Sequence, residues 1–371
     1  MLKEFINKNK TFIIIYSILL IIGIGGIIFS YNNYSLYKQP IAKIDSITEE
    51  HIATEELSYG FKEEVYNQYI KATIMNGEDK GKEITIKNEY HQSEAYDQKY
   101  KVNDELIVSL NKRDNTIINS RIEGYKRDKY LITAAIILIL VIILVGKIKG
   151  LLSIISVIIN ILLFYLIINL NAKGISLVLL SYLGALLFSI ICLLLVAGFN
   201  KKSLAAITSS IISVTITMLI SLIVIKFTNF EGIRFEQMEL LTRPYEGIYI
   251  AELILGGLGA IMDISITMAS SLNELIDKDD KISIQALTKS GTEIGKDVMG
   301  TMINVLFFTY ICSVIPNLAI YFRNGFNMGI LMREYISLEM SRALVGAIGI
   351  VIAIPISISI CLLFYKRRLK K

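Results

Sequence analysis

Long uninterrupted blocks of apolar residues constrain this chain more than any other sequence feature. Hydrophobic residues make up 53% of its 371 residues and the mean hydropathy is +0.56, so lipid must be the solvent for most of the chain. A helix of about 20 apolar residues spans the ~30 Å hydrocarbon core of a bilayer. We therefore expect an α-helical polytopic membrane bundle of about eight transmembrane helices, at residues 11–29, 130–146, 150–172, 174–200, 203–225, 247–273, 298–322 and 343–365.

The positions of the basic residues predict the side of the membrane on which each loop lies. Lys and Arg concentrate at residues 3–10, 147–149, 201–202, 278–296 and 366–371. With eight spans all of these segments fall on one side, which the positive-inside rule identifies as the cytoplasm. We expect a multi-pass protein of the bacterial plasma membrane with both termini cytoplasmic. A nucleic-acid partner would need these charges on one soluble surface, so none is expected.

Three domains follow from this pattern. Residues 1–30 form a transmembrane anchor, whose apolar run is longer than that of a cleaved signal peptide and is not followed by an A-x-A site. Residues 31–129 lie on the extracytoplasmic side, and residues 130–371 form a seven-helix membrane domain. The exported segment alternates with the period of β-strands, and Asn76-Gly77 indicates a hairpin over residues 69–88. Five short strands favour a small OB-like β-barrel.

The sequence carries no recognisable catalytic or metal-binding pattern. His51 and His91 are the only histidines, and neither has a Cys or a second His at ligand spacing. Cys192, Cys312 and Cys361 all lie inside predicted spans, which argues against a disulfide framework or a thiolate metal site. No Ser/His/Asp or Cys/His constellation is present in the exported domain. We therefore expect no catalytic residue, no metal and no cofactor, and we do not expect an enzyme.

The sixth span is the most informative segment because it carries ionisable residues. Each such residue inside a membrane costs roughly 2.5–3.5 kcal/mol on insertion scales and so calls for an explanation. Polar residues and glycines recur here at steps of three or four, which places them on one helical face. They are Glu252, Gly256, Gly259, Asp263, Thr267 and Ser270. We therefore do not expect this polar stripe to face lipid.

The seventh span carries a related stripe and runs through the membrane in the opposite direction. Its members are Glu293, Asp297, Gly300 and Asn304. From the rise per residue, Asp263, Asp297 and Asn304 reach similar depths, and we expect them to converge on one pocket. The predicted intramembrane polar or coupling residues are Asp263, Asp297, Asn304, Glu252, Thr267 and Ser270. The predicted helix-packing residues are Gly256, Gly257, Gly259, Gly300, Gly346 and Gly349.

Structural explanations for these features stay open at this point. Glu293 completes a helix-capping box. Glu252 either snorkels toward the membrane surface or pairs with Arg243 or Arg342. The hydroxyls of the fifth span, such as that of Thr217, either line a pathway or bond back to their own helix.

Two stretches of these spans resemble the YibE/F family of bacterial multi-pass membrane proteins. They read GGLGAIMD at residues 256–263, followed by ASSLNEL at 269–275, and GKDVMGTMIN at 295–304. The resemblance covers roughly residues 125–370, and longer family members also carry an N-terminal span and an exported domain. It implies a location and an architecture but no substrate. Lys296 stands where many relatives are expected to have Arg, a change that keeps the charge and loses bidentate geometry.

The stripes favour a transporter or permease for a small solute or ion, with Asp263 and Asp297 as the ionisable pair. The alternative is a non-transporting membrane scaffold or sensor, whose exported domain binds a partner and whose stripes only hold helices together. An intramembrane enzyme ranks third, because no HExxH, GxGD or Ser/His pair accompanies the two acids. The expected partners are the lipid bilayer and either a related membrane protein or a second copy of the chain.

Overall fold

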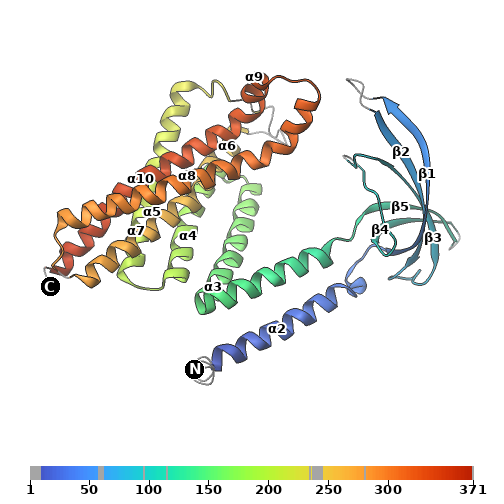
Figure 1. Ribbon diagram of the computed structural model, residues 1–371, viewed down its shortest axis with the longest axis horizontal. Coiled ribbons are helices and arrows are strands. Elements are labelled where there is room, and N and C mark those ends of the chain that lie inside the picture. The colour runs from blue at the N-terminus through green and yellow to red at the C-terminus, as the bar shows by residue number, and fades with distance from the viewer. Residues whose placement is uncertain are drawn as a thin grey trace. The chain divides into compact units, whose positions relative to one another are not determined.

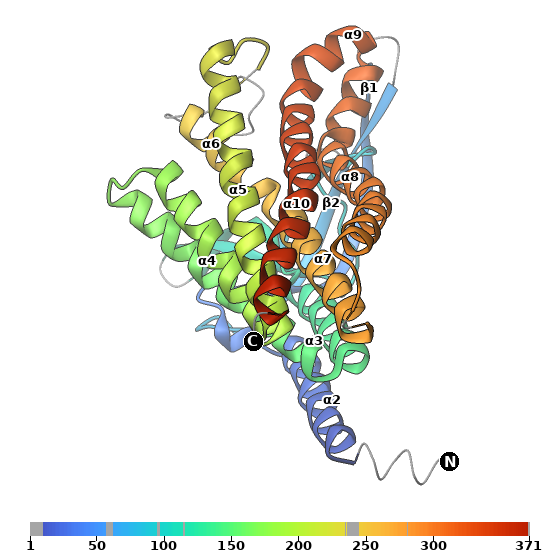
Figure 2. The same cartoon turned by 90° about the vertical axis from the view of Figure 1, so that its left-hand side faces the viewer.

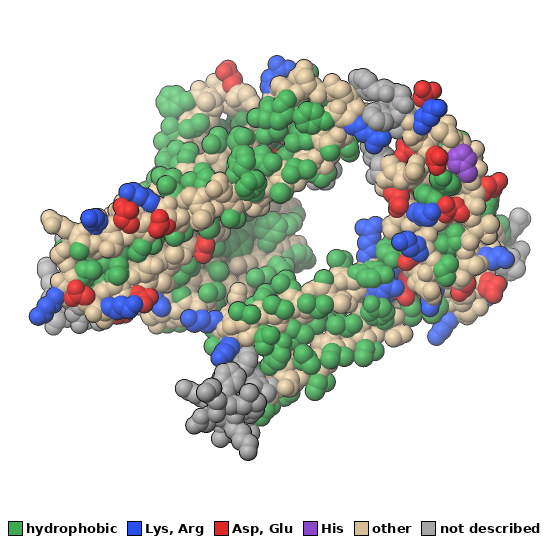
Figure 3. All heavy atoms as spheres, in the orientation of Figure 1, with side chains coloured by type: hydrophobic (Ala, Val, Ile, Leu, Met, Phe, Trp, Pro, Cys, Tyr) green, Lys and Arg blue, Asp and Glu red, His purple; other side chains and the backbone are tan. Residues whose placement is uncertain are grey.

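The structure is a computed structural model that describes residues 10–56, 62–94, 97–113, 116–233, 235, 245–279 and 281–369. The chain divides into two compact units, Met1–Gly150 and Leu151–Lys371. The first unit holds the apolar helix α2 (Lys10–Ser30), the short 3-10 helix η1 (Tyr34–Leu36) and a β-sheet, and the second is helical (Figure 1). Hydrophobic side chains cover much of the visible surface of the helices, whereas charged side chains gather on the sheet and near helix ends (Figure 3).

Five antiparallel strands form one sheet in the first unit, in the order β3-β2-β1-β4-β5. They are β1 (Ile41–Glu56), β2 (Lys62–Ile74), β3 (Glu83–His91), β4 (Glu105–Arg113) and β5 (Thr116–Tyr125). Side chains from alternate positions of a strand point to one face of a sheet. In β2, Ile70, Ala72 and Ile74 follow this rule and join an apolar core that also holds Ile44 and Leu106.

The turn after β2 depends on glycine. Gly77 and Gly81 have φ angles of +74° and +88°, a region that glycine enters without steric cost. The antiparallel hairpin predicted over residues 69–88 is present. The outer strands β3 and β5 also approach each other, and the Ser120 hydroxyl donates to the Thr85 carbonyl at 3.0 Å. No backbone ladder joins these two strands within the described residues, so the closed barrel stays a prediction.

A buried ion cluster ties the sheet to the helices of the first unit. The Lys126 ammonium is buried and lies 3.0 Å from carboxylate oxygens of both Glu105, on β4, and Asp128. It also donates to the Ser30 carbonyl at the end of α2, at 3.3 Å. The Lys129 ammonium lies 3.5 Å from Glu105. Because an unpaired buried charge is strongly penalised, these contacts fix the junction between sheet and helices.

Helix α3 (Asp128–Ala172) combines two of the predicted spans. Lys147 interrupts it with φ 51° and ψ −129°, and no loop separates the two halves. The described residues therefore form seven apolar helices: six that are long enough to cross a membrane, and the shorter α2. The predicted number of about eight helices is therefore wrong, because α3 combines two predicted helices across a kink at Lys147, with no loop between its halves.

The remaining helices of the second unit pack around one apolar core. They are α4 (Leu177–Ala197), α5 (Lys201–Thr228), α6 (Tyr245–Gly256), α7 (Leu258–Lys278), α8 (Ile284–Arg323), α9 (Met328–Leu331), the π-helical turn η4 (Met332–Ile336) and α10 (Ser337–Leu369). Helix α10 lies beside α5, α7 and α8 (Figure 2). The length and apolar character of these helices are those of a membrane-embedded protein.

Candidate functional site

A cleft of about 580 Å³ opens between α3, α4, α6, α8 and α10 in the second unit. Its volume lies within the usual range for small-molecule sites. Most of its wall is apolar, with Phe164 and Ile167 from α3 and Ile248 and Leu255 from α6. The polar residues that line it are Asn171, Ser181, Glu252, Tyr310 and Arg342.

Arg342 lies between two carboxylates at the wall of this cleft. Its guanidinium pairs with Glu252 of α6 and with Glu339 of α10. The side chains of Arg342 and Glu339 are each 12% exposed, whereas that of Glu252, which lines the cleft, is 39% exposed. When both acids are ionised, two negative charges meet one positive charge and the cluster carries a net −1. Arg342 Nε is buried and has no hydrogen-bond partner among the described residues.

Contacts between α6 and α10 position this cluster. Of its three charges, two stand three residues apart on α10, a spacing that puts them on one face. The Tyr249 hydroxyl of α6 donates to Ser341 Oγ of α10 at 2.7 Å. The helices cross closely because Gly257 and Gly346 lack side chains: a Cβ on Gly257 would lie 3.1 Å from the Gly346 Cα. The pairing of Glu252 that the sequence left open is therefore with Arg342, while Arg243 lies outside the described residues.

Tyr310 of α8 also lines the site, and the sequence analysis missed it. Its hydroxyl occupies the space into which a Cβ on Gly256 would project. Gly256 therefore leaves space for the phenol ring of Tyr310, and not for the close approach of another helix backbone. Sequence offers only a weak indication of this role, because a Tyr in an apolar span equally suits an aromatic belt at the membrane surface.

Asp263 of α7 does not face the core. It is exposed, whereas Ile261 and Ser265, two positions away on either side, are buried. Residues two apart on a helix point in nearly opposite directions. Thr267 and Ser270 are half-buried on the same side as Asp263.

The stripe of α8 has the same arrangement. Asp297 and Asn304 are exposed, and each stands two positions from a buried residue, Gly295 and Leu306 respectively. Their side chains therefore point away from the packed face of α8. The expected common pocket is not formed within one chain, because helical periodicity identifies a shared face without showing what that face meets. A coupling role for the two acids stays a prediction.

The glycines predicted for helix packing fall into different environments. Gly349 is tightly packed: a Cβ there would lie 2.6 Å from Ile261 Cδ1. Gly257 and Gly346 share the close α6–α10 crossing described above. By contrast, a Cβ on Gly259 or Gly300 would meet no described atom within 4 Å. These two glycines lie on the same exposed faces as Asp263 and Asp297.

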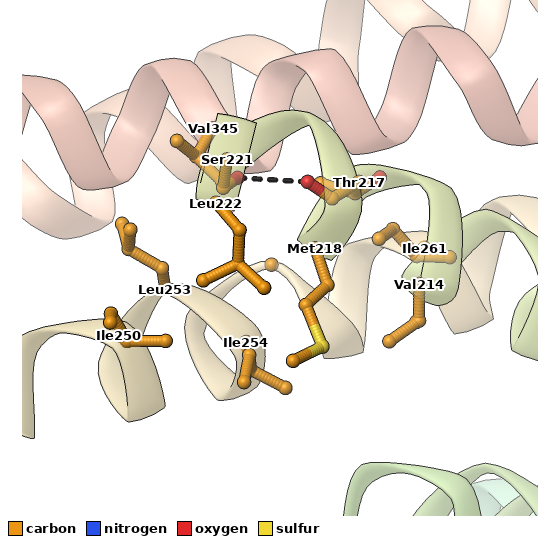
Figure 4. Close-up of a pocket in the computed structure, with 11 residues that line it drawn as sticks. Val214, Thr217, Met218, Ser221, Leu222, Ile250, Leu253, Ile254, Ile261 and Val345 are labelled. Atoms are coloured by element: carbon orange, nitrogen blue, oxygen red, sulfur yellow. Dashed lines mark hydrogen bonds between the residues drawn. The ribbon is translucent and has the colours of Figure 1, made fainter. Parts of the chain in front are cut away.

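The hydroxyl stripe of α5 satisfies its own hydrogen bonds. Thr217 and Ser221 each donate to the carbonyl four residues earlier, at 2.8 Å. Both border a cavity of about 10 Å³ among apolar side chains such as Met218 and Ile254 (Figure 4). This volume has room for about one water molecule. Hydrogen bonding to their own helix, the second of the two explanations given above, therefore accounts for these hydroxyls.

Outside the cleft, titratable groups form ion pairs and the larger Lys126 cluster. The described residues contain no group of three or more His, Cys, Asp or Glu side chains that could hold a metal ion. In the sheet, His91 Nδ1 lies 2.5 Å from Asp97 Oδ2. This hydrogen bond, with the charge of Asp97, raises the pKa of His91 above its ordinary value.

The apolar helices and the ionisable cleft between them define the class: an integral membrane protein. Family comparison then identifies it further. The chain matches the YibE/F-like protein family over residues 134–367 and the YibE/F family N-terminal domain over residues 35–125. The chain belongs to the YibE/F-like family, which confirms the resemblance. No curated protein and no solved structure matches it.

Proposed function

We propose that the chain is a membrane carrier whose cleft binds a small, largely apolar solute with a positive charge or hydrogen-bond donors. The observation that carries this proposal is the Glu252–Arg342–Glu339 cluster beside a cleft of about 580 Å³. Ionisable residues at membrane depth are expensive and mark substrate or ion pathways by default. A purely structural ion pair would not need an open cavity beside it.

The chemistry of the cleft supports this class of solute. Its apolar walls can enclose a hydrophobic body, and the partly exposed Glu252 carboxylate can accept a bond from a cationic or donor group. The Tyr310 hydroxyl supplies a donor for a polar edge of the solute. Because the ionised cluster carries a net −1, a proton and a cationic solute would compete for it, which is the simplest basis for proton coupling.

We also propose that the carrier lies in the bacterial plasma membrane, with both termini in the cytoplasm and residues 31–129 outside. The distribution of Lys and Arg along the chain supports this orientation. In this arrangement each half of α3 crosses the bilayer, and Lys147 lies at the cytoplasmic surface between them.

Purified protein in sealed vesicles tests the carrier. The probes are two lipophilic cations, tetraphenylphosphonium and ethidium, driven by an imposed pH gradient. We expect saturable uptake above that of protein-free vesicles, lost in Glu252→Gln and kept in Glu246→Gln, a matched change on the exposed face of α6. The carrier would be contradicted by vesicles whose uptake equals the protein-free background, or by Glu252→Gln vesicles that behave like wild type.

A second candidate, a sensor or scaffold, is favoured by the Lys126 cluster, which joins the sheet firmly to its helices. Such a joint suits transmission of a binding event from the exported sheet. This candidate predicts that Lys126→Met abolishes cellular function while Glu252→Gln does not. Lys99→Met is the control, since the Lys99–Glu49 pair is exposed and pairs of that kind contribute about 1 kcal/mol or less.

A further inference from the structure

The outer faces of α7 and α8 combine polar groups with open space. Asp263, Asp297 and Asn304 are exposed there, and none has a hydrogen-bond or ion-pair partner among the described residues. Gly259 and Gly300 lie on the same faces with no described atom near their missing side chains. A lone chain would leave these three polar groups without a partner, and acyl chains cannot satisfy those that lie within the hydrocarbon.

Contacts between α7 and α8 set the depth of each group. The Leu272 side chain of α7 reaches Gly291 of α8, and the Tyr310 hydroxyl of α8 reaches Gly256, just before α7, so these two contacts mark matching levels on the two helices. Interpolating between these levels at about 1.5 Å per residue, Thr267 lies level with Asp297 and Ser270 with Glu293. By the same interpolation, Asp263 lies within about 4 Å of the level of Asn304.

These matched depths pair hydrogen-bond acceptors with donors. Each carboxylate on one helix has a hydroxyl or amide within about 4 Å of its own depth on the other helix. Within one chain the two faces point away from the packed sides of their helices and cannot meet across the α7–α8 contact. A two-fold axis along the membrane normal preserves depth, so it would bring α7 of one copy against α8 of the other, twice.

We infer that the chain forms a homodimer in the membrane, in which the polar face of α7 in each copy packs against that of α8 in the other. The occupant of these faces is a second copy because the complementary groups are the chain's own and stand within about 4 Å of equal depths. The two helices can approach closely because Gly259 and Gly300 have no side chain between the backbones, as in other glycine-mediated helix pairs. This inference concerns a different surface from the cleft and does not depend on transport.

Cross-linking between differently tagged full-length copies tests the dimer. In a background without Cys192, Cys312 and Cys361, one copy carries Ser270→Cys and the other Glu293→Cys. We expect a disulfide-linked dimer on mild oxidation in membranes, since depth and helix contact bring these positions within disulfide range. The control replaces Glu293→Cys by Leu204→Cys on α5, which is 49% exposed and outside the interface.

The stoichiometry in vesicles gives an independent readout. Single-molecule photobleaching should show two steps for the wild type, one step for Gly300→Leu, and two for Leu204→Phe as the size control. Single-step bleaching of the wild type, or cross-linking no stronger than with Leu204→Cys, would overturn the dimer. So would stoichiometric co-purification of a different membrane protein that cross-links to Ser270→Cys. Uptake by a monomeric wild type would leave the carrier proposal standing.

Discussion

Arg342 is the residue on which the cleft depends most, because it holds two carboxylates together inside the bundle. Removing one partner of a buried ion pair costs about 3–5 kcal/mol. Since Glu252 is 39% exposed, we expect a smaller effect here, and Arg342→Gln should lower the free energy of unfolding by roughly 2–3 kcal/mol. Thermal unfolding in detergent measures this loss.

A triple variant serves as the control. Neutralising the whole cluster with Arg342→Met, Glu252→Gln and Glu339→Gln should recover most of the stability, because no uncompensated charge remains. If the single and triple variants lose stability equally, the packing of the Arg342 side chain matters more than its charge.

His91 gives the sheet domain a pH-dependent stability. Its pKa is raised by the hydrogen bond to Asp97, so the folded state binds the proton more tightly than the unfolded state, where the pKa is about 6.5. The stabilisation is therefore complete below that unfolded value and is lost as the pH rises through the raised, folded value. An NMR titration of His91 should show the raised pKa. Asp97→Asn should flatten this part of the stability profile, and an unchanged profile would exclude the pair as its source.

For single residues, the sequence predicted which side chains need a partner better than it predicted which way side chains point. That Glu252 needs a partner followed from its cost in a membrane, and Arg342 was among the two partners considered. The outward direction of Asp263 and Asp297 did not follow, because a 3.6-residue period groups side chains on a face and says nothing about the neighbour of that face. Tyr310 gave only a weak indication of its role, since what singles it out is the missing side chain of Gly256 on another helix.

Among the elements, the seam between α8 and α10 depends on glycines that a substitution can test. A Cβ on Gly295 would collide with Ile354 Cγ2, a methyl on a stiff β-branched side chain. We expect Gly295→Ala to destabilise the protein, since overpacking costs roughly 1–3 kcal/mol and the helix-propensity gain is at most about 1 kcal/mol.

Gly291→Ala is the matched substitution one turn away. The nearest atoms there belong to Ile358 and Leu272 side chains, at 3.1 Å, and their outer parts can move aside. Thermal unfolding should therefore rank Gly295→Ala as clearly less stable than Gly291→Ala. Equal unfolding temperatures would mean that the seam relaxes as a whole.

The presence of a helix or strand was predictable wherever the sequence pattern of that element dominated. The apolar blocks predicted the long helices, and the Asn76-Gly77 turn predicted the β2–β3 hairpin. The junction inside α3 was not predictable, because Lys147 and its neighbours look like a basic loop and give no indication that the helix continues with one non-helical residue. Barrel closure was equally beyond the sequence, since it depends on how far the sheet curls between β3 and β5.

On the scale of the whole molecule, the proposed topology depends on the geometry of α3. A straight helix of its 45 residues would be about 67 Å long, more than twice the ~30 Å hydrocarbon core. Its halves on either side of Lys147 are about 28 and 37 Å long, and each is sufficient for one crossing. Two crossings keep both termini on one side, in agreement with the distribution of basic residues.

Labelling of single cysteines tests this topology in intact cells of a cysteine-free variant. An impermeant maleimide should label Ser109→Cys on β4 directly, but Lys147→Cys and Lys281→Cys only after the membrane is permeabilised. If α3 crossed the membrane once, Lys147→Cys would be buried in the bilayer and stay unlabelled under both conditions. Lys281→Cys would then be labelled from outside, because one fewer crossing inverts every later loop. The pattern at these three positions therefore separates the two topologies, and the first requires Lys147 to lie at the cytoplasmic surface.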